Sequence, residues 1–211
     1  MKMKFLALLG ASVAMLGVAS ADASTIYSNG PIDGTQQAWT INVGFALTNS
    51  FTLGSTQTIT GFTFGGWTLG GDVINSVDYG FSTSADYAIT GNASLSAGGV
   101  LSSPFGYDVR EYSASITPLT LGPGTYWFAL QNATTAGGNL AFWDVNNGPS
   151  VAFENTIGNV NGYLFPGSNS SAFTLTGGAV PEPASWAMMV GGFGLVGGAM
   201  RARRKAAVSF A

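Results

Sequence analysis

The side chains between residues 24 and 179 that could do chemistry are almost all carboxylates. This stretch holds no His, no Cys and a single basic residue, Arg110. Nucleophilic triads, His-based acid–base catalysis and zinc sites depend on His, Cys or an activated Lys. The sequence therefore argues against all three kinds of site.

Two carboxylates facing one another across a cleft could still serve a glycan hydrolase. Asp144 and Glu154 flank a turn rich in Asn, Gly and Pro, and they are the candidate pair. Asp108 and Glu111 lie three apart in a predicted strand, so their side chains point to opposite faces. Asp108 shares a face with Arg110, which predicts a surface ion pair. We expect no catalytic residue, and a glycan hydrolase is the most distant functional alternative.

A turn-rich stretch offers oxygen ligands for a cation. Asp72, Asn75 and Asp78 carry the carboxylate and amide oxygens that Ca²⁺ prefers, so they are candidate calcium ligands. The same residues would also suit Asx-turns and a solvated loop. No other cofactor is expected.

Three tryptophans raise the question of sugar binding, because a flat aromatic ring can cover the apolar face of a sugar. They are Trp67, Trp127 and Trp143. Trp127 falls on the opposite strand face from Tyr126 and Phe128, and one face of each sheet in a sandwich is wet. Trp127 is therefore the candidate glycan contact, while burial of all three rings in the core is the competing and favoured prediction.

The charge of residues 24–179 restricts the partners. Eight acids against one base give a net charge near −7. Phosphate backbones are bound by Lys and Arg, so no nucleic-acid partner is expected. Without Cys, an exported fold must rely on its core and not on disulfides.

The elements that position these residues are predicted to be β-strands. Seven odd positions from Trp39 to Leu53 are apolar and the even positions are small or polar, which predicts one or two strands with the odd residues buried. Residues 125–131 repeat the pattern, and shared faces are predicted for Tyr126, Phe128 and Leu130, for Val77, Tyr79 and Phe81, and for Phe173 and Leu175. Turn signals recur about every ten residues. This combination favours a single all-β domain over 24–179, a jelly-roll-like antiparallel β-sandwich.

The first 23 residues have the three zones of a secretory signal peptide. Lys2 and Lys4 precede an uncharged apolar stretch from Phe5 to Val18, and small residues follow up to position 23. Ala19-Ser20-Ala21 and Ala21-Asp22-Ala23 both suit a signal peptidase. We expect an N-terminal signal helix over 1–23, removed by signal peptidase at one of these two sites.

The other end predicts a membrane span. Residues 184–200 form an uncharged stretch of 17 residues, the lower end of what crosses a bilayer as a helix. Trp186 stands where an interfacial aromatic belongs. The basic cluster that would stop transfer and hold this end in the cytoplasm is Arg201, Arg203, Arg204 and Lys205.

Residues 180–205 resemble the PEP-CTERM sorting signal of exosortase substrates. The resemblance rests on the motif over 181–187, the apolar helix and the Arg-rich end, with Trp and Ala placed as in the PEPxxWA subtype. The motif residues are Pro181, Glu182, Pro183, Trp186 and Ala187. The resemblance implies processing by an exosortase-type membrane enzyme that cuts near Pro-Glu-Pro, in Gram-negative bacteria that make extracellular polysaccharide.

Segments of the middle also resemble a common PEP-CTERM ectodomain, whose architecture is jelly-roll-like. They are residues 50–53, residues 124–133, and Trp143-Asp144 followed by Gly148-Pro149-Ser150. Together these features predict a protein in transit through the inner membrane and then at the cell surface or outside the cell. The predicted role is structural or interactive, linked to extracellular polysaccharide or biofilm; the alternative is a carbohydrate-binding module.

Overall fold

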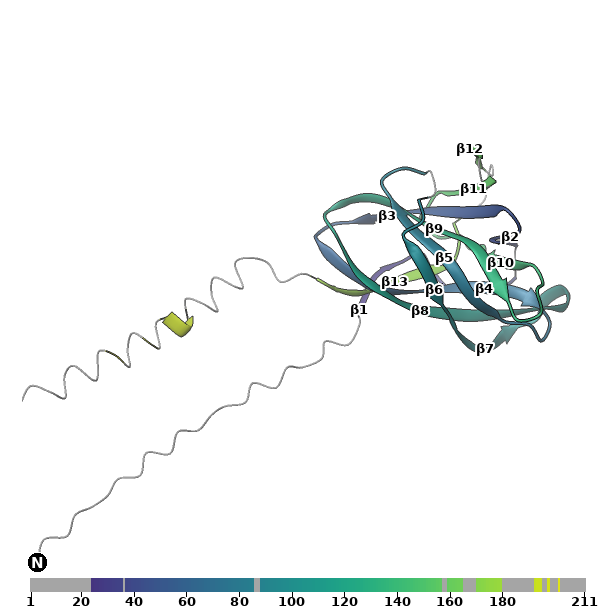
Figure 1. Ribbon diagram of the computed structural model, residues 1–211, viewed down its shortest axis with the longest axis horizontal. Helices are drawn as coiled ribbons and strands as arrows, with labels where there is room; N and C mark the ends of the chain where they lie inside the picture. The colour runs from purple at the N-terminus through teal and green to yellow at the C-terminus, as the bar shows by residue number, and fades with distance from the viewer. Residues whose placement is uncertain are drawn as a thin grey trace, which may run out of the picture.

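The structure is a computed structural model that describes residues 24–35, 37–85, 88–156, 159–164 and 170–179, together with 192–194, 197 and 201. Between 24 and 179, the described elements are strands and one short 3₁₀ turn, η1 (Pro104–Gly106). The strands form two antiparallel sheets stacked face to face (Figure 1). The predicted antiparallel β-sandwich is confirmed, and its jelly-roll-like connectivity stays a prediction.

Sheet A has seven strands and is built around one long strand, β4 (Gln57–Leu69). β8 (Tyr107–Leu121) pairs along one edge of β4, and β7 (Ser96–Ser102) lies outside β8. On the other edge, β13 (Phe173–Ala179) covers residues 57–64 and β10 (Ala141–Asp144) covers 66–68. β1 (Ser24–Ser28) then pairs with β13, and β2 (Ala38–Thr40) with β10.

Sheet B has six strands in the order β12-β11-β3-β9-β5-β6. The strands are β3 (Phe45–Leu53), β5 (Ile74–Ser82), β6 (Gly91–Ser94), β9 (Gly124–Thr135), β11 (Ala152–Thr156) and β12 (Asn159–Leu164). β3 and β9 pair without a register shift, from Ala46 opposite Gln131 to Leu53 opposite Gly124.

An aromatic core fills the space between the sheets. Phe128 of β9 lies at its centre and is fully buried. Its ring centroid is 5.0 Å from that of Phe62, 5.3 Å from Phe173 and 5.6 Å from Trp143, all on sheet A. Both sheets supply rings because alternate residues of each strand point inward.

The predicted strand faces are largely confirmed. Phe128 and Leu130 of β9 are fully buried, and Tyr126 packs against the same core. Val77, Tyr79 and Phe81 share the inner face of β5, as Phe173 and Leu175 do in β13.

The odd-residue pattern from Trp39 to Leu53 is correct for Ile41, Leu47, Phe51 and Leu53 and wrong at Val43. Phe51 and Leu53 are buried and Thr52 is exposed, but Val43 is 68% exposed. Val43 and Gly44 have φ values of 47° and 91°, in a turn that separates β2 from β3. The side-chain alternation therefore restarts after the turn and does not run through it.

The even residues Ala46 and Thr48 were expected to face outward and are fully buried. The Thr48 hydroxyl donates to Ala85 O at 3.3 Å and to Phe153 O at 3.4 Å. The segment after β5 and the neighbouring strand β11 thus cover this part of the outer face.

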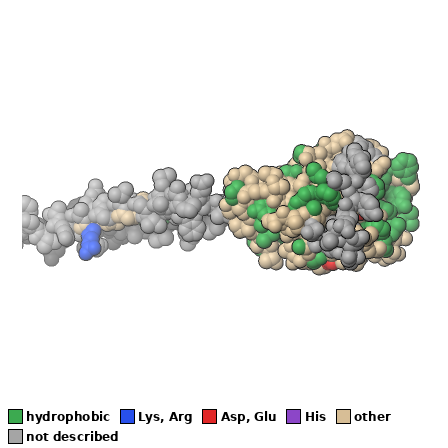
Figure 2. Space-filling model, turned by 90° about the horizontal axis from the view of Figure 1, so that it is seen from above, with side chains coloured by type: hydrophobic (Ala, Val, Ile, Leu, Met, Phe, Trp, Pro, Cys, Tyr) green, Lys and Arg blue, Asp and Glu red, His purple; other side chains and the backbone are tan. Residues whose placement is uncertain are grey.

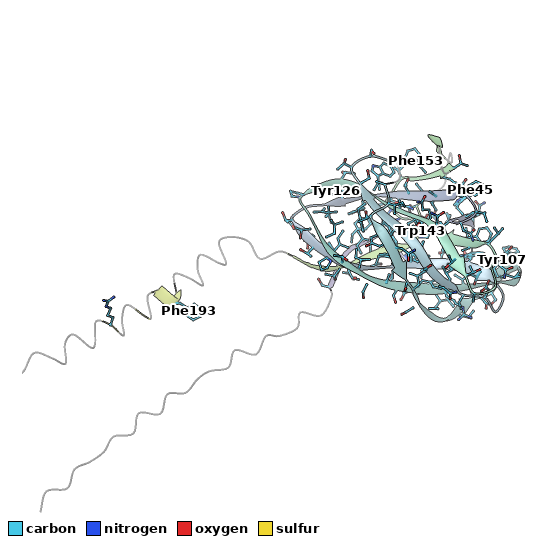
Figure 3. The ribbon with its side chains drawn as sticks, viewed as in Figure 1. Phe45, Tyr107, Tyr126, Trp143, Phe153 and Phe193 are labelled. Carbon is cyan, nitrogen blue, oxygen red and sulfur yellow. The ribbon has the colours of Figure 1, made fainter. Side chains whose placement is uncertain are left out.

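The sandwich has two distinct ends. At the proximal end, Ser24 pairs with Gly177 and Gln57 pairs with Ala179, so β1 begins where β13 finishes. At the distal end Leu69 pairs with Tyr107. β4 joins the two ends over about 40 Å, at 3.3 Å per residue. In Figure 3 the labels of Tyr126 and Tyr107 mark the opposite ends.

The predicted signal helix over 1–23 lies outside the described residues. Of the predicted transmembrane segment over 184–200, only 192–194 and 197 are described, and these are helical. Among the residues with described structure, no helix has the length and apolar character needed to span a membrane.

Candidate functional site

An aromatic hollow opens on the distal end of sheet A, on the outer face. It has a volume of about 210 Å³, and we call it the distal pocket; its lining residues are Ala38, Trp67, Phe105, Tyr107 and Phe142. Hydrophobic side chains gather at this end of the sandwich in Figure 2. None of the described lining side chains is charged.

Strand pairing brings the pocket residues together from distant parts of the chain. Trp67 of β4 stands directly opposite Phe142 of β10. Tyr107 is the first residue of β8 and pairs with Leu69 of β4, on the side of β4 that faces away from β10. The Tyr107 and Phe142 rings meet edge to face, with centroids 5.6 Å apart. Such pairs contribute about 0.5–1.5 kcal/mol beyond their buried area.

The floor of the pocket is fixed by a buried carboxylate. Trp67 is only 5% exposed, and its Nε1 donates to Asp144 Oδ1 at 2.6 Å. The same carboxylate accepts hydrogen bonds from the backbone N–H groups of Asp33 at 3.0 Å and Gly34 at 3.2 Å. Asp144 therefore holds both the indole and the segment that folds over sheet A after β1.

Asp144 is fully buried, and this changes its titration. Burial raises the pKa of Asp144 to about 6, and the hydrogen bonds from Trp67, Asp33 and Gly34 oppose that rise only in part. The Asp144 carboxyl group, which anchors Trp67, therefore changes its protonation state near pH 6.

Phe105 has the most exposed of the large hydrophobic side chains in the described chain, at 86%. It sits inside η1 with φ 55°, in the left-handed region. A bulky residue in that conformation is strained. Phe105 therefore combines a strained backbone with a side chain that gains little from packing inside the protein.

Next to the pocket, the turn after β10 is tied down by amide side chains. Asn146 Nδ2 donates to Asn29 O at 2.8 Å and to Pro31 O at 3.1 Å, and Ser170 Oγ donates to Asn146 Oδ1 at 2.6 Å. The segment from Trp143 to Ser150, which carries part of the resemblance to PEP-CTERM ectodomains, thus has a structural role. Trp143 lies in the core, and Asp144 and Asn146 fasten the segment over sheet A.

The candidate carboxylate pair, Asp144 and Glu154, is separated in the structure. Asp144 belongs to sheet A and Glu154 to β11 of sheet B, and Asp144 Oδ1 and Oδ2 already accept from three N–H donors. Asp108 and Arg110 form the predicted ion pair, with Nη2 and Oδ2 3.3 Å apart.

The candidate calcium ligands lie in separate networks. Asp72 accepts from Gly137 N at 2.8 Å and Asn139 Nδ2 at 2.9 Å. Burial alone would raise the pKa of Asp72, but hydrogen bonds from Asn139, Gly137 and Val73 hold it below its ordinary value. Asp78, on β5, accepts from the side-chain amides of Asn92 and Asn132, both at 2.8 Å.

Asn75 is exposed, close to the start of β5. Extended strand at 3.3 Å per residue carries Asp78 about 13 Å beyond Ile74, so Asp72 and Asp78 point to different surroundings. In the part of the chain with described structure, no three His, Cys, Asp or Glu side chains gather in a group that could hold a metal.

The three tryptophans divide between core and surface. Trp143 and Trp67 are buried, whereas Trp127 is half-buried. Trp127 pairs with Ser50 and Ser82 and lies on the outer face of sheet B, where its ring centroid is 5.1 Å from that of Phe153. The competing prediction that all three are core is wrong for Trp127.

The sequence reasoning did not identify Phe105, Tyr107 or Phe142 as site residues. One local signal points to the first: Phe105 stands between Pro104 and Gly106, and an aromatic inside a Pro-X-Gly turn cannot alternate into a core. Tyr107 and Phe142 have no comparable signal, because their neighbours depend on the strand order of sheet A.

The C-terminal segment that follows the last strand of the sandwich matches a known sorting motif. β13 finishes at Ala179. Residues 179–205 match the family model described as the PEP-CTERM protein-sorting motif, in agreement with the predicted tail over 180–205. No curated protein matches the chain.

The chain therefore carries a PEP-CTERM sorting motif, which implies an exported protein that is processed by an exosortase and anchored at the cell surface. The motif residues Pro181, Glu182, Pro183, Trp186 and Ala187 lie outside the described residues, as do Arg203, Arg204 and Lys205. Arg201 is helical and exposed.

Proposed function

We propose that the β-sandwich is a non-catalytic surface module that acts by contact within the extracellular polysaccharide or biofilm layer. The observation that carries this proposal is the sorting motif, which begins at the last residue of β13. The folded sandwich is then the cargo that the sorting step delivers. The route is the inner membrane first and the cell surface or the extracellular space afterwards, with signal peptidase and an exosortase-type enzyme as processing partners.

The use of the carboxylates supports a non-catalytic role. Asp72, Asp78, Asp108 and Asp144 each accept at least two hydrogen bonds from within the protein. A general acid or base needs an oxygen that can reach the substrate. These four carboxylates instead fasten turns, strand ends and, at Asp78, neighbouring strands.

Replacing Glu182 with Ala should block sorting, because it removes the only charge in the Pro-Glu-Pro motif. Full-length precursor should accumulate in the inner membrane, whereas wild-type protein extracted from the surface should end near the motif. Fractionation followed by intact-mass measurement reads both. Ser185→Ala, which changes a neighbour outside the motif residues, is the control and should be processed normally. Equal processing of the Glu182 variant would contradict the proposed route.

A carbohydrate-binding module is the second candidate, and the half-buried ring of Trp127 on the outer face of sheet B favours it. Trp127→Ala should weaken retention of the protein by extracellular polysaccharide from the producing bacterium. Stability should change little, because the ring contacts Phe153 on the outer face and takes no part in the core. Affinity electrophoresis and thermal melting test the two effects. A large drop in Tm would show that Trp127 is structural and would remove it as a glycan contact.

A further inference from the structure

We propose that the distal pocket binds a neutral sugar ring, as one residue of an uncharged polysaccharide. This inference rests on the proposed surface function and adds a site and a ligand class to it. The pocket lies on the opposite sheet from Trp127, and it offers the rings of Tyr107 and Phe142, over a floor formed by the buried Trp67, to one small ligand.

The chemistry of the lining fits a ring with an apolar face and a polar edge. Aromatic side chains cover apolar C–H groups with little loss of conformational entropy. Among the described residues, neither the Tyr107 hydroxyl nor the Thr40 hydroxyl has a hydrogen-bond partner. Thr40 stands opposite Phe142, beside the pocket. Each hydroxyl can both donate and accept, as sugar hydroxyls do.

The size of the pocket selects a single small ring over a protein partner. Its volume is about 210 Å³, below the roughly 300–1,000 Å³ of sites for drug-sized ligands. Stable protein interfaces bury about 800 Å² on each partner, far more than one such hollow provides.

Charge selects a neutral ligand. No lining residue is charged, and residues 24–179 carry a net charge near −7, from eight acids and one base. The field of such a domain repels polyanions. An anionic polysaccharide would therefore find no cation in the pocket and a repulsive domain around it.

Phe105 supplies an independent observation. Strain that packing does not offset is characteristic of ligand-binding positions. The left-handed backbone at Phe105 holds an 86% exposed ring at the mouth of the pocket. A bound sugar would cover that ring, and the strained turn keeps it in place beforehand.

The position of the pocket fits its role. The tail leaves from the proximal end after Ala179, and the pocket lies at the distal end of β4, about 40 Å away. A sandwich attached through its tail would therefore present the pocket away from the attachment.

The test uses two substitutions with the same backbone effect. Phe105→Gly removes the ring and relieves the strain at φ 55°. Val43→Gly relieves the same kind of strain at φ 47°, on an exposed residue that does not line the pocket. Glycine adopts this conformation without steric cost. Both variants should therefore melt at the wild-type Tm or above it.

The readout is retention of the surface-extracted protein in affinity electrophoresis. The gels contain neutral glucan, galactan or mannan, or anionic polygalacturonate as the charged counterpart. We expect wild type and Val43→Gly to be retained by at least one neutral polymer and not by polygalacturonate. Phe105→Gly should lose roughly tenfold or more in affinity at unchanged or higher Tm.

Each other outcome overturns the inference in a recognisable way. Equal retention of Phe105→Gly and wild type would exclude the pocket and leave the surface function intact, because the Glu182 variant tests that separately. Retention by polygalacturonate alone would exclude the neutral ligand class. No retention of wild type by any neutral polymer would exclude sugar binding at the pocket. Dimeric wild type with monomeric Phe105→Gly in gel filtration, without retention of either, would make the pocket a contact between two copies.

Discussion

Phe128→Ala should lower the free energy of unfolding by about 3–5 kcal/mol, the usual cost of deleting a buried aromatic ring. The Phe128 side chain is fully buried between the two sheets. It contacts rings from both, including Phe81 at 5.1 Å and Phe62 at 5.0 Å between centroids. Neither sheet can close over the cavity alone, because each is held by its own hydrogen-bonded ladder. Urea unfolding followed by tryptophan fluorescence measures the loss.

The matched control for this substitution is Thr125→Ala, in the same strand. Thr125 is exposed, and among the described residues its hydroxyl forms a hydrogen bond only with the Thr52 hydroxyl, at 3.0 Å. Exposed substitutions of this kind usually stay within about 0.5 kcal/mol. Similar losses for Thr125→Ala and Phe128→Ala would mean that the faces of β9 are wrongly assigned.

Asp144 should make the protein less stable as the pH rises through 6. Its pKa is about 6 in the folded protein, against 3.8 as the ordinary value. The folded state therefore binds the proton more tightly than the unfolded state does. The stabilisation, at most about 3 kcal/mol, is complete below pH 3.8 and is lost as the pH rises through 6. About half of it is lost between pH 5 and pH 7.5.

Asp144→Asn isolates this effect. Residue 144 of the variant cannot ionise, so the fall in stability between pH 5 and pH 7.5 should be smaller than in wild type. Glu154, whose pKa is also raised by burial, keeps its own share of the pH dependence. At either pH the variant should be less stable than wild type by about 1–3 kcal/mol, because the new NH₂ group faces N–H donors and leaves at least one unsatisfied. Urea midpoints at the two pH values measure both quantities. A wild-type midpoint that rises with pH over this range would contradict the assignment.

The loss of folding stability at low pH should come from other carboxylates, Asp108 and Asp72. Hydrogen bonds from Gly71 and Ser103 hold the pKa of Asp108 below its ordinary value, and the pKa of Asp72 is also below its ordinary value. The stability that these two carboxylates provide is present above their ordinary pKa and is lost as the pH falls below it. The window of Asp144 between pH 5 and pH 7.5 is therefore separate from theirs.

The strand faces could be read from the sequence wherever alternation ran through a strand without interruption. β9 and β5 are such cases, since the inward positions there are aromatic or branched aliphatic residues. Val43 shows the limit. Its odd position extends the pattern of β2 into β3, and only the backbone of the turn reveals that the two strands are separate.

The central strand of sheet A was harder to recognise because glycines replace side chains within it. A Cβ on Gly66 would lie 2.7 Å from the Tyr112 ring, and one on Gly65 would lie 2.7 Å from Asp144 Cβ. Close approach of these neighbours requires glycine, and the same glycines erase the alternation that marks a strand. Without β4, the order of sheet A is hidden in the sequence.

The candidate site depends on that hidden order. Trp67 and Asp144 are 77 residues apart, and they meet only because β10 pairs with the distal half of β4. Trp127 was placed correctly on an outer face from its neighbours in the same strand. A pocket made by several strands needs their pairing, which local patterns do not contain.

The pairing of β13 has a mechanical consequence. β13 is hydrogen-bonded on both sides, to β1 and to β4, in the residues just before the sorting tail. A pull between the tail and the distal end runs along these strands, so it loads both ladders in shear. Many hydrogen bonds then resist together, whereas a pull across the strands would open them one after another. A domain with this strand arrangement can stay folded while it transmits tension between a ligand bound at its distal end and the attachment of its tail.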